Sequence, residues 1–71
     1  MESKVTQALH FQRDLYSYAF SRQLAIMGGR YEDAMRFHFL WLSDADDYVH
    51  LVRSMTKEEE LEFVMAKNCY N

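Results

Sequence analysis

The stretch RFHFLWL, residues Arg36 to Leu42, can form either a strand or a helix, and the choice decides the fold. Taken alone, Phe37, Phe39 and Trp41 alternate along the chain as they do in a half-buried strand. A wider window has a helical period instead, since residues of one face recur at intervals of four and three. That face consists of Ala34, His38, Trp41, Ala45, Tyr48, Val52 and Met55. The sequence therefore predicts a helix over residues 30–54.

This predicted helix is apolar around almost its whole circumference at RFHFLWL. Two apolar residues flank Trp41 on each side, Phe37 and Leu40 on one and Phe39 and Leu42 on the other. A helix at the surface of a soluble protein normally has a single apolar face, so this one needs cover from several directions. Aromatic residues are also enriched in protein interfaces. We therefore predict an interface, with a second copy or another protein, formed by Phe37, Phe39, Leu40, Trp41, Leu42 and Tyr48.

The preceding segment is predicted to be an amphipathic helix over residues 3–27. Its polar residues recur at intervals of four and three and form one solvent-exposed stripe of Ser3, Gln7, His10, Asp14, Ser17 and Ser21. Residues 28–29 are the predicted turn. We expect Gly28 to adopt the left-handed conformation that closes a helix, and Gly29 to serve as the N-cap of the next one.

A third, shorter helix is predicted over residues 57–68. Thr56 followed by Glu59 has the spacing of a capping box, which marks a helix N-terminus. A helix of about a dozen residues is marginal in isolation, so it must dock on the other two. The predicted docking stripe consists of Leu61, Val64 and Met65.

The predicted fold is therefore all-α, a single domain over residues 1–71 in which an antiparallel hairpin carries a short third helix. The chain has no proline and only two glycines, so the turns that an all-β domain needs are missing. A two-glycine connection makes the long helices antiparallel neighbours. A hairpin has one interface and cannot cover two broad apolar faces. We therefore expect a homo-oligomer, most simply a twofold dimer that forms a four-helix bundle with the third helices as lids.

Composition narrows the class of partner and the compartment. The net charge of −3 argues against nucleic-acid binding, which usually needs a basic surface. We find neither a signal-peptide core nor an apolar run near the 18 or so residues that cross a bilayer, so no membrane association is expected. The single cysteine, Cys69, indicates a reducing compartment, and we predict a cytoplasmic protein.

Two pairs of residues have metal-ligand spacing on a helix: His10 with Asp14, and Asp46 with His50. We favour surface hydrogen bonds or ion pairs for both, and expect no metal and no cofactor. His38 has the chemistry of a general base or a pH switch, but no nucleophile motif accompanies it. A packed histidine is the preferred interpretation, and no catalytic residue is predicted.

Two charged clusters suggest alternative functions. Arg22, Arg30 and Arg36 surround the predicted turn and form a candidate anion-binding or nucleotide-binding site, or else simply solubilise the loop. The acidic residues could mimic the phosphates of DNA and inhibit a DNA-binding protein, although a net charge of −3 is small for that role. They are Asp44, Asp46, Asp47, Glu58, Glu59, Glu60 and Glu62.

Residues 21–55, SRQLAIMGGRYEDAMRFHFLWLSDADDYVHLVRSM, resemble the small helical accessory proteins encoded between the exonuclease and excisionase genes in the early region of lambdoid bacteriophages. The resemblance covers about half of the chain and includes no motif of known chemical role. It implies a non-enzymatic early phage protein that acts in the host cytoplasm by contacting a host protein. Such a protein would bias infection towards lytic rather than lysogenic development or perturb the host cell cycle.

Overall fold

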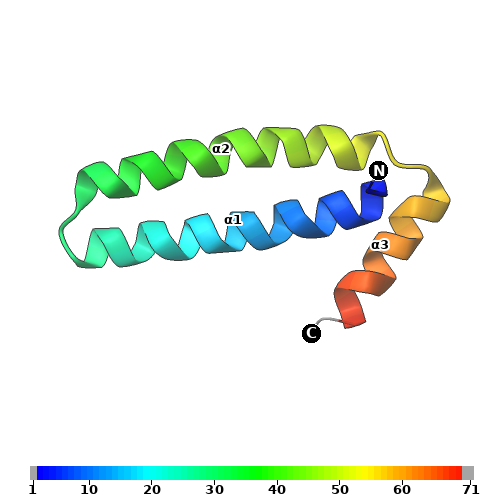
Figure 1. The fold of residues 1–71 in the computed structure, drawn as a ribbon, viewed down its shortest axis with the longest axis horizontal. Helices are drawn as coiled ribbons and strands as arrows, with labels where there is room; N and C mark the ends of the chain where they lie inside the picture. Colours follow the sequence, from blue (N-terminus) through cyan, green and yellow to red (C-terminus); the bar gives the residue numbers. More distant parts are fainter. Residues whose placement is uncertain (1, 70–71) are drawn as a thin grey trace.

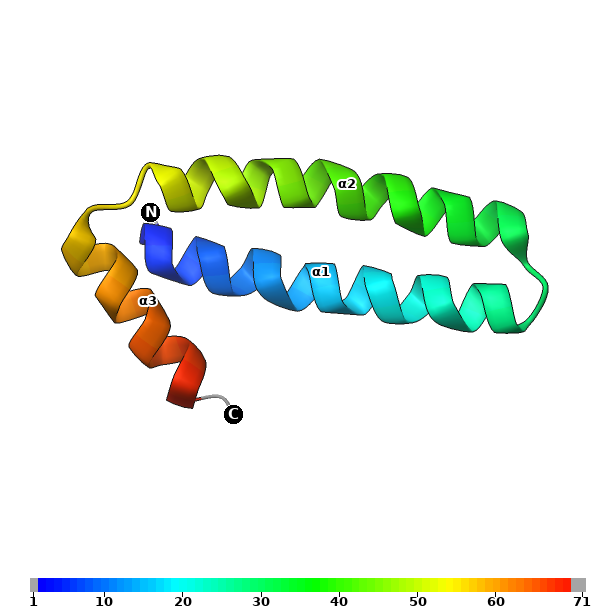
Figure 2. The ribbon, with the colours of Figure 1, turned by 180° about the vertical axis from the view of Figure 1, so that it is seen from behind.

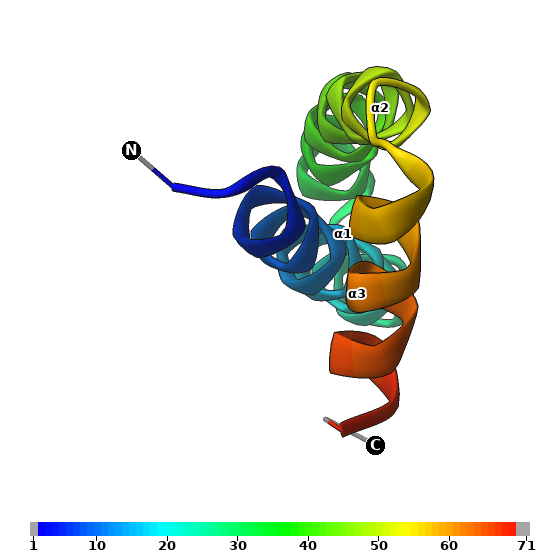
Figure 3. The same ribbon diagram turned by 90° about the vertical axis from the view of Figure 1, so that its right-hand side faces the viewer.

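A computed structural model of the chain, which describes residues 2–69, consists of three α-helices joined by two short connections. They are α1 (Lys4–Met27), α2 (Tyr31–Arg53) and α3 (Lys57–Cys69). α1 and α2 lie side by side as a hairpin, and α3 crosses its open end (Figure 1). Viewed end-on, α3 runs down from the end of α2 past α1 (Figure 3). The all-helical hairpin is confirmed, and each helix begins and ends within one residue of its predicted bounds.

The Gly-Gly turn closes α1 in a way that corrects the predicted roles of both glycines. Gly28 has a φ of −87°, whereas Gly29 has a φ of 75° and is the left-handed residue. The Arg30 N–H donates to the Ala25 carbonyl at 2.8 Å and the Gly29 N–H to the Ile26 carbonyl at 3.1 Å, which is the Schellman pattern. The N-cap of α2 is Arg30, not Gly29, and its side chain makes no capping bond.

The face of α2 that packs on α1 starts as predicted but runs through Phe37 rather than His38. His38 is exposed, while Phe37 and Trp41 are partly buried and Ala34 is buried. This inner seam recurs at intervals of three and four and consists of Ala34, Phe37, Trp41, Asp44, Tyr48, Leu51 and Met55. The predicted helical period was right, but three members of the predicted face, His38, Ala45 and Val52, each lie one residue beyond a member of the inner seam.

The predicted solvent-exposed stripe of α1 is only partly exposed. Gln7, Asp14 and Ser21 are partly buried, so one edge of the stripe turns towards the rest of the molecule. Apolar residues on the opposite side reach solvent instead, and they are Tyr16, Phe20, Leu24 and Met27. α1 is therefore amphipathic in sequence, but a single partner helix is too narrow to cover its apolar side.

α3 docks through Phe63, a residue outside the predicted docking stripe. Phe63 is 5% exposed and joins Val5, Ala8 and Met55 in the main core cluster. Its ring meets Tyr48 edge-on, with 6.3 Å between the ring centroids. The predicted stripe was wrong, because its three members face solvent: Leu61, Val64 and Met65.

Polar side chains hold the helix ends at the open end of the hairpin. The predicted capping box is confirmed: the Thr56 N–H donates to Glu59 Oε1 at 2.9 Å, and the Glu59 N–H donates to Thr56 Oγ1 at 3.2 Å. Lys4 Nζ donates to the carbonyl of Ser54 at 3.0 Å and ties the start of α1 to the end of α2. The helix dipole of α2 favours a cation at this position.

Candidate interaction surface

The folded chain exposes more area than a compact protein of its mass. Its accessible surface is 5620 Å², about 900 Å² above the roughly 4,700 Å² that size scaling predicts for a compact monomer. The radius of gyration is 14.2 Å, against about 11 Å for a compact domain of this length. The principal-axis extents of 44 × 24 × 19 Å give the reason, because a long hairpin with a helix at one end is a rod.

The core inside this rod is small. Its buried apolar residues are Val5, Ala8, Ala25, Ala34, Met55 and Phe63. Half of them are alanines, which allow the two helix backbones to approach but bury little apolar area. Seen from behind, the ribbon of α3 reaches across the open end only and leaves the rest of both long helices uncovered (Figure 2).

The six residues predicted to form an interface divide into two groups. Phe37, Trp41 and Tyr48 are partly buried and belong to the inner seam of α2. The others face solvent, with exposed fractions of 61% for Phe39, 43% for Leu40 and 45% for Leu42. The structure thus places the first group inside the hairpin, and the second group is free to meet another molecule.

A second line of apolar residues runs along α2, and sequence reasoning did not identify it. This outer stripe consists of Tyr31, Met35, His38, Leu42, Ala45, Val49 and Val52. Its members recur at intervals of four and three, as those of the inner seam do, but most of them face solvent. Only Val52 packs against the core cluster. The sequence signal of this stripe is the same period of three and four residues, beginning at Tyr31 instead of Ala34.

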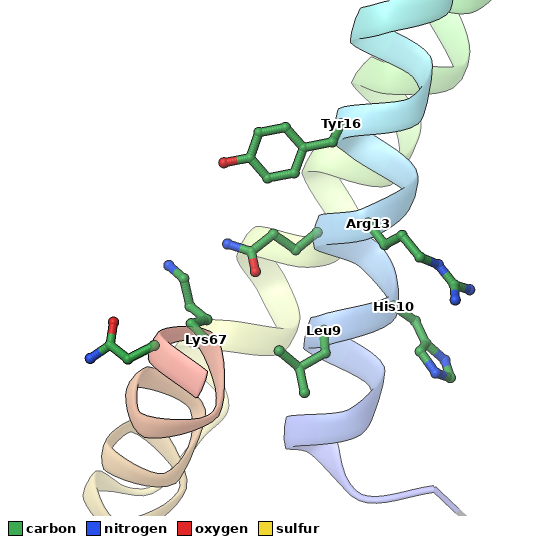
Figure 4. Close-up of a pocket in the computed structure, with 7 residues that line it drawn as sticks. Leu9, His10, Arg13, Tyr16 and Lys67 are labelled. Atoms are coloured by element: carbon green, nitrogen blue, oxygen red, sulfur yellow. The ribbon is translucent and has the colours of Figure 1, made fainter. Parts of the chain in front are cut away.

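An open cleft of about 650 Å³ lies between α1 and α3. Tyr16 and Leu9 extend from α1 towards α3, and Lys67 faces them, whereas His10 and Arg13 point to the other side of α1 (Figure 4). Lys67 Nζ lies 5.3 Å from the centroid of the Phe63 ring and so makes a cation–π contact. The basic side chains beside this cleft, Lys67, His10 and Arg13, point in different directions. A small-molecule site needs polar groups that point to a common centre, so the cleft lacks this feature.

The three arginines predicted to bind an anion are exposed around the turn. Arg30 lies 3.9 Å from the carboxylate of Asp33, measured from Nη1 to Oδ2, in a loose ion pair at the start of α2. Arg22 and Arg36 lie on α1 and α2 with their side chains exposed. The three arginines thus lie around the turn, as the sequence predicted. Their binding to a nucleotide or phosphate stays a prediction.

The two pairs with metal-ligand spacing, His10 with Asp14 and Asp46 with His50, differ from each other in the structure. His50 Nε2 lies 3.6 Å from Asp46 Oδ1, as the spacing suggested. His10, by contrast, approaches Glu2 rather than Asp14, with 3.5 Å between Nδ1 and Oε2. Within residues 2–69, no three His, Cys, Asp or Glu side chains come together in a group that could hold a metal ion.

Acidic groups from both long helices meet near the middle of the hairpin. Partial burial raises the pKa of Asp44, and the nearby charges of Asp14 and Asp47 raise it further. Burial also raises the pKa of Tyr48, with a smaller contribution from Tyr16. At the start of α3, the hydrogen bond from the Thr56 N–H lowers the pKa of Glu59. These shifts accompany helix packing and capping, and none of the three groups lines the cleft.

In the part of the chain that the structure describes, no helix has the length and apolar character needed to cross a bilayer. Comparison with protein-family models, with curated proteins and with solved structures found no match to this chain.

Proposed function

We propose that this chain is a non-enzymatic helical module that associates with itself in the cytoplasm and acts by binding another protein. The observation that carries the proposal is the accessible area, about 900 Å² above that of a compact monomer. Large apolar side chains contribute to this surface, and Phe20, Tyr31 and Phe39 are each more than 60% exposed. Large exposed apolar patches mark protein-interaction sites, and aromatic residues are enriched there.

The resemblance of residues 21–55 to early lambdoid phage accessory proteins supports the biological part of the proposal. In that setting the partner is a host protein, and the outcome is a bias between lytic and lysogenic development. A small helical module with an exposed apolar surface suits this role, because contact with a host protein needs no catalytic group.

Sedimentation velocity over about two decades of protein concentration, together with thermal melting, tests the self-association. A self-associating module sediments as more than one chain, and its melting temperature rises with concentration because assembly stabilises the folded state. A single chain at every concentration, with a constant melting temperature, would contradict the proposal.

The second part of the proposal needs a variant that leaves the fold intact. Phe39 is 61% exposed, so Phe39→Glu should keep its helical circular dichroism. In capture experiments from bacterial lysate, we expect the unchanged chain to retain a partner protein in an amount that rises with the concentration of the chain. The Phe39→Glu variant should not retain that protein. If both chains retained the same set of proteins, Phe39 would not belong to the binding surface.

A further inference from the structure

The outer stripe of α2 has the spacing of a second helix-packing seam. Side chains that recur at intervals of four and three are those by which two long helices pack along each other. The inner seam of α2 is occupied by α1, whereas the outer stripe is open over most of its length. Tyr31 is 67% exposed, Met35 60%, and both Leu42 and Val49 more than 40%. The stripe is therefore a packing surface with no helix on it.

We infer that a second copy of this chain occupies the outer stripe, with its own α2 running antiparallel about a twofold axis. The inference rests on the proposed function, because it identifies the partner and the face through which the chain would associate with itself. It is based on the pairing of residues when two outer stripes are placed antiparallel. When Tyr31 lies opposite Val49 of the second copy, Met35 falls opposite Ala45 and His38 opposite Leu42.

This pairing joins large side chains with small ones. Met35 faces an alanine, and Tyr31 faces a valine, so these two layers of the interface fill without overpacking. The twofold axis repeats every layer, because a symmetric dimer uses the same patch on both copies. His38 is the single polar member, and one polar residue in such a seam is a known means of defining orientation and register.

The length of the outer stripe and the excess surface area of the chain both fit a second copy of α2. Tyr31 and Val49 are separated by about 27 Å along the helix axis, so only a long, straight helix can cover the stripe. α2 itself has 23 residues and meets that requirement. The excess area of about 900 Å² is similar to the roughly 800 Å² that each partner contributes to a standard interface.

The corresponding line on α1 fits a second copy less well. It passes through Tyr16, Phe20 and Met27, which are exposed, but Arg13 and Gln23 interrupt it at the same spacing. A helix packed there would bury an arginine and an amide opposite apolar side chains, and unpaired buried polar groups are costly. The outer stripe of α2 contains only one polar residue and is the better seam.

Disulfide trapping tests the register. With the exposed Cys69 changed to serine, Met35→Cys and Ala45→Cys are introduced together into one chain. Mild oxidation should give a covalent dimer, because positions 35 and 45 of the two copies face each other. Met35→Cys alone should stay uncrosslinked, since antiparallel packing puts its two copies about 15 Å apart along the axis, beyond the roughly 7 Å between Cα atoms that a disulfide permits. A dimer from Met35→Cys alone, with none gained from the pair, would indicate parallel packing and overturn the inference.

Substitutions at two comparable leucines test which face of α2 forms the dimer interface. Leu42 belongs to the outer stripe and Leu40 does not, yet their exposed fractions are nearly equal at 45% and 43%. Leu42→Glu should weaken dimerisation by roughly 100-fold or more, because twofold symmetry places the charge in the interface twice. Leu40→Glu should leave the dimer intact, and circular dichroism verifies that both variants remain helical.

The outcomes separate this inference from the proposal on which it rests. If the unchanged chain is a dimer that survives Leu42→Glu but dissociates with Leu40→Glu, self-association stands and the outer stripe is the wrong face. If the unchanged chain sediments as a monomer at every concentration, both the inference and the self-association fail.

Discussion

The open end of the hairpin and its Gly-Gly end use the same kinds of residue but cover them differently. At the open end, α3 brings Phe63 onto Val5 and Ala8 and completes a small core. At the Gly-Gly end no third helix is present among the described residues, and Met27 and Tyr31 are 73% and 67% exposed. Apolar composition therefore does not by itself produce a core, because burial of a helix depends on how many neighbours surround it.

The largest expected effect is at the open end. Phe63→Ala should destabilise the protein by about 3–4 kcal/mol, because it removes the buried side chain through which α3 docks. Urea denaturation at one fixed protein concentration measures the loss, and the concentration must be fixed because self-association contributes to stability. Leu61→Ala on the same helix is the control. Leu61 is 63% exposed, so its loss should stay within about 0.5 kcal/mol. Equal losses would mean that α3 does not dock as described.

A smaller effect is expected at the turn. Gly29 has a φ of 75°, so Gly29→Ala should cost about 1–2 kcal/mol through the strain of a side chain in the left-handed region. Gly28→Ala is the matched control, because Gly28 has a φ of −87°. A Cβ there would lie 3.4 Å from Nε of the flexible Arg30 side chain and in ordinary contact with the carbonyl oxygens of Leu24 and Ala25, at 3.5 and 3.8 Å. Thermal melting of the two variants side by side checks the assignment. A greater loss from Gly28→Ala would show that the left-handed residue is misplaced.

The smallest expected effect is between the two ends, at Asp44. Its pKa in the folded protein lies above its ordinary value of 3.8, so ionisation of this carboxyl disfavours the folded state. The cost is absent below pH 3.8 and develops as the pH rises through the folded-state pKa. Asp44→Asn should therefore stabilise the protein at neutral pH by about a few tenths of a kcal/mol, a small gain because solvent screens the site.

The pH dependence of that gain is the critical measurement. The difference in melting temperature between Asp44→Asn and the unchanged chain should shrink as the pH falls towards 3.8 and vanish below it. A gain that persists at low pH would have a different origin, because protonated Asp44 carries no charge for the substitution to remove.

Several features of the candidate surface were predictable only in part. The exposed members of the predicted interface, Phe39, Leu40 and Leu42, were identified because they exceed what one hairpin can cover. Phe63 was missed because it forms no periodic stripe with other large apolar residues: the positions three and four residues away are Glu59, Glu60, Ala66 and Lys67. The outer stripe was missed because its residues alternate in sequence with those of the inner seam, and three of them, His38, Ala45 and Val52, were assigned to the inner face.

The sequence by itself determined the three helices, the antiparallel hairpin and the capping box at Thr56. These features depend on periods of three and four residues, on two adjacent glycines and on a four-residue motif, all of which act over short distances along the chain. Only the tertiary structure decided which of two apolar stripes on α2 meets α1, and that Phe63 rather than Leu61 docks α3. Those choices depend on the rotation of each helix about its axis, which is set by packing against residues distant in sequence.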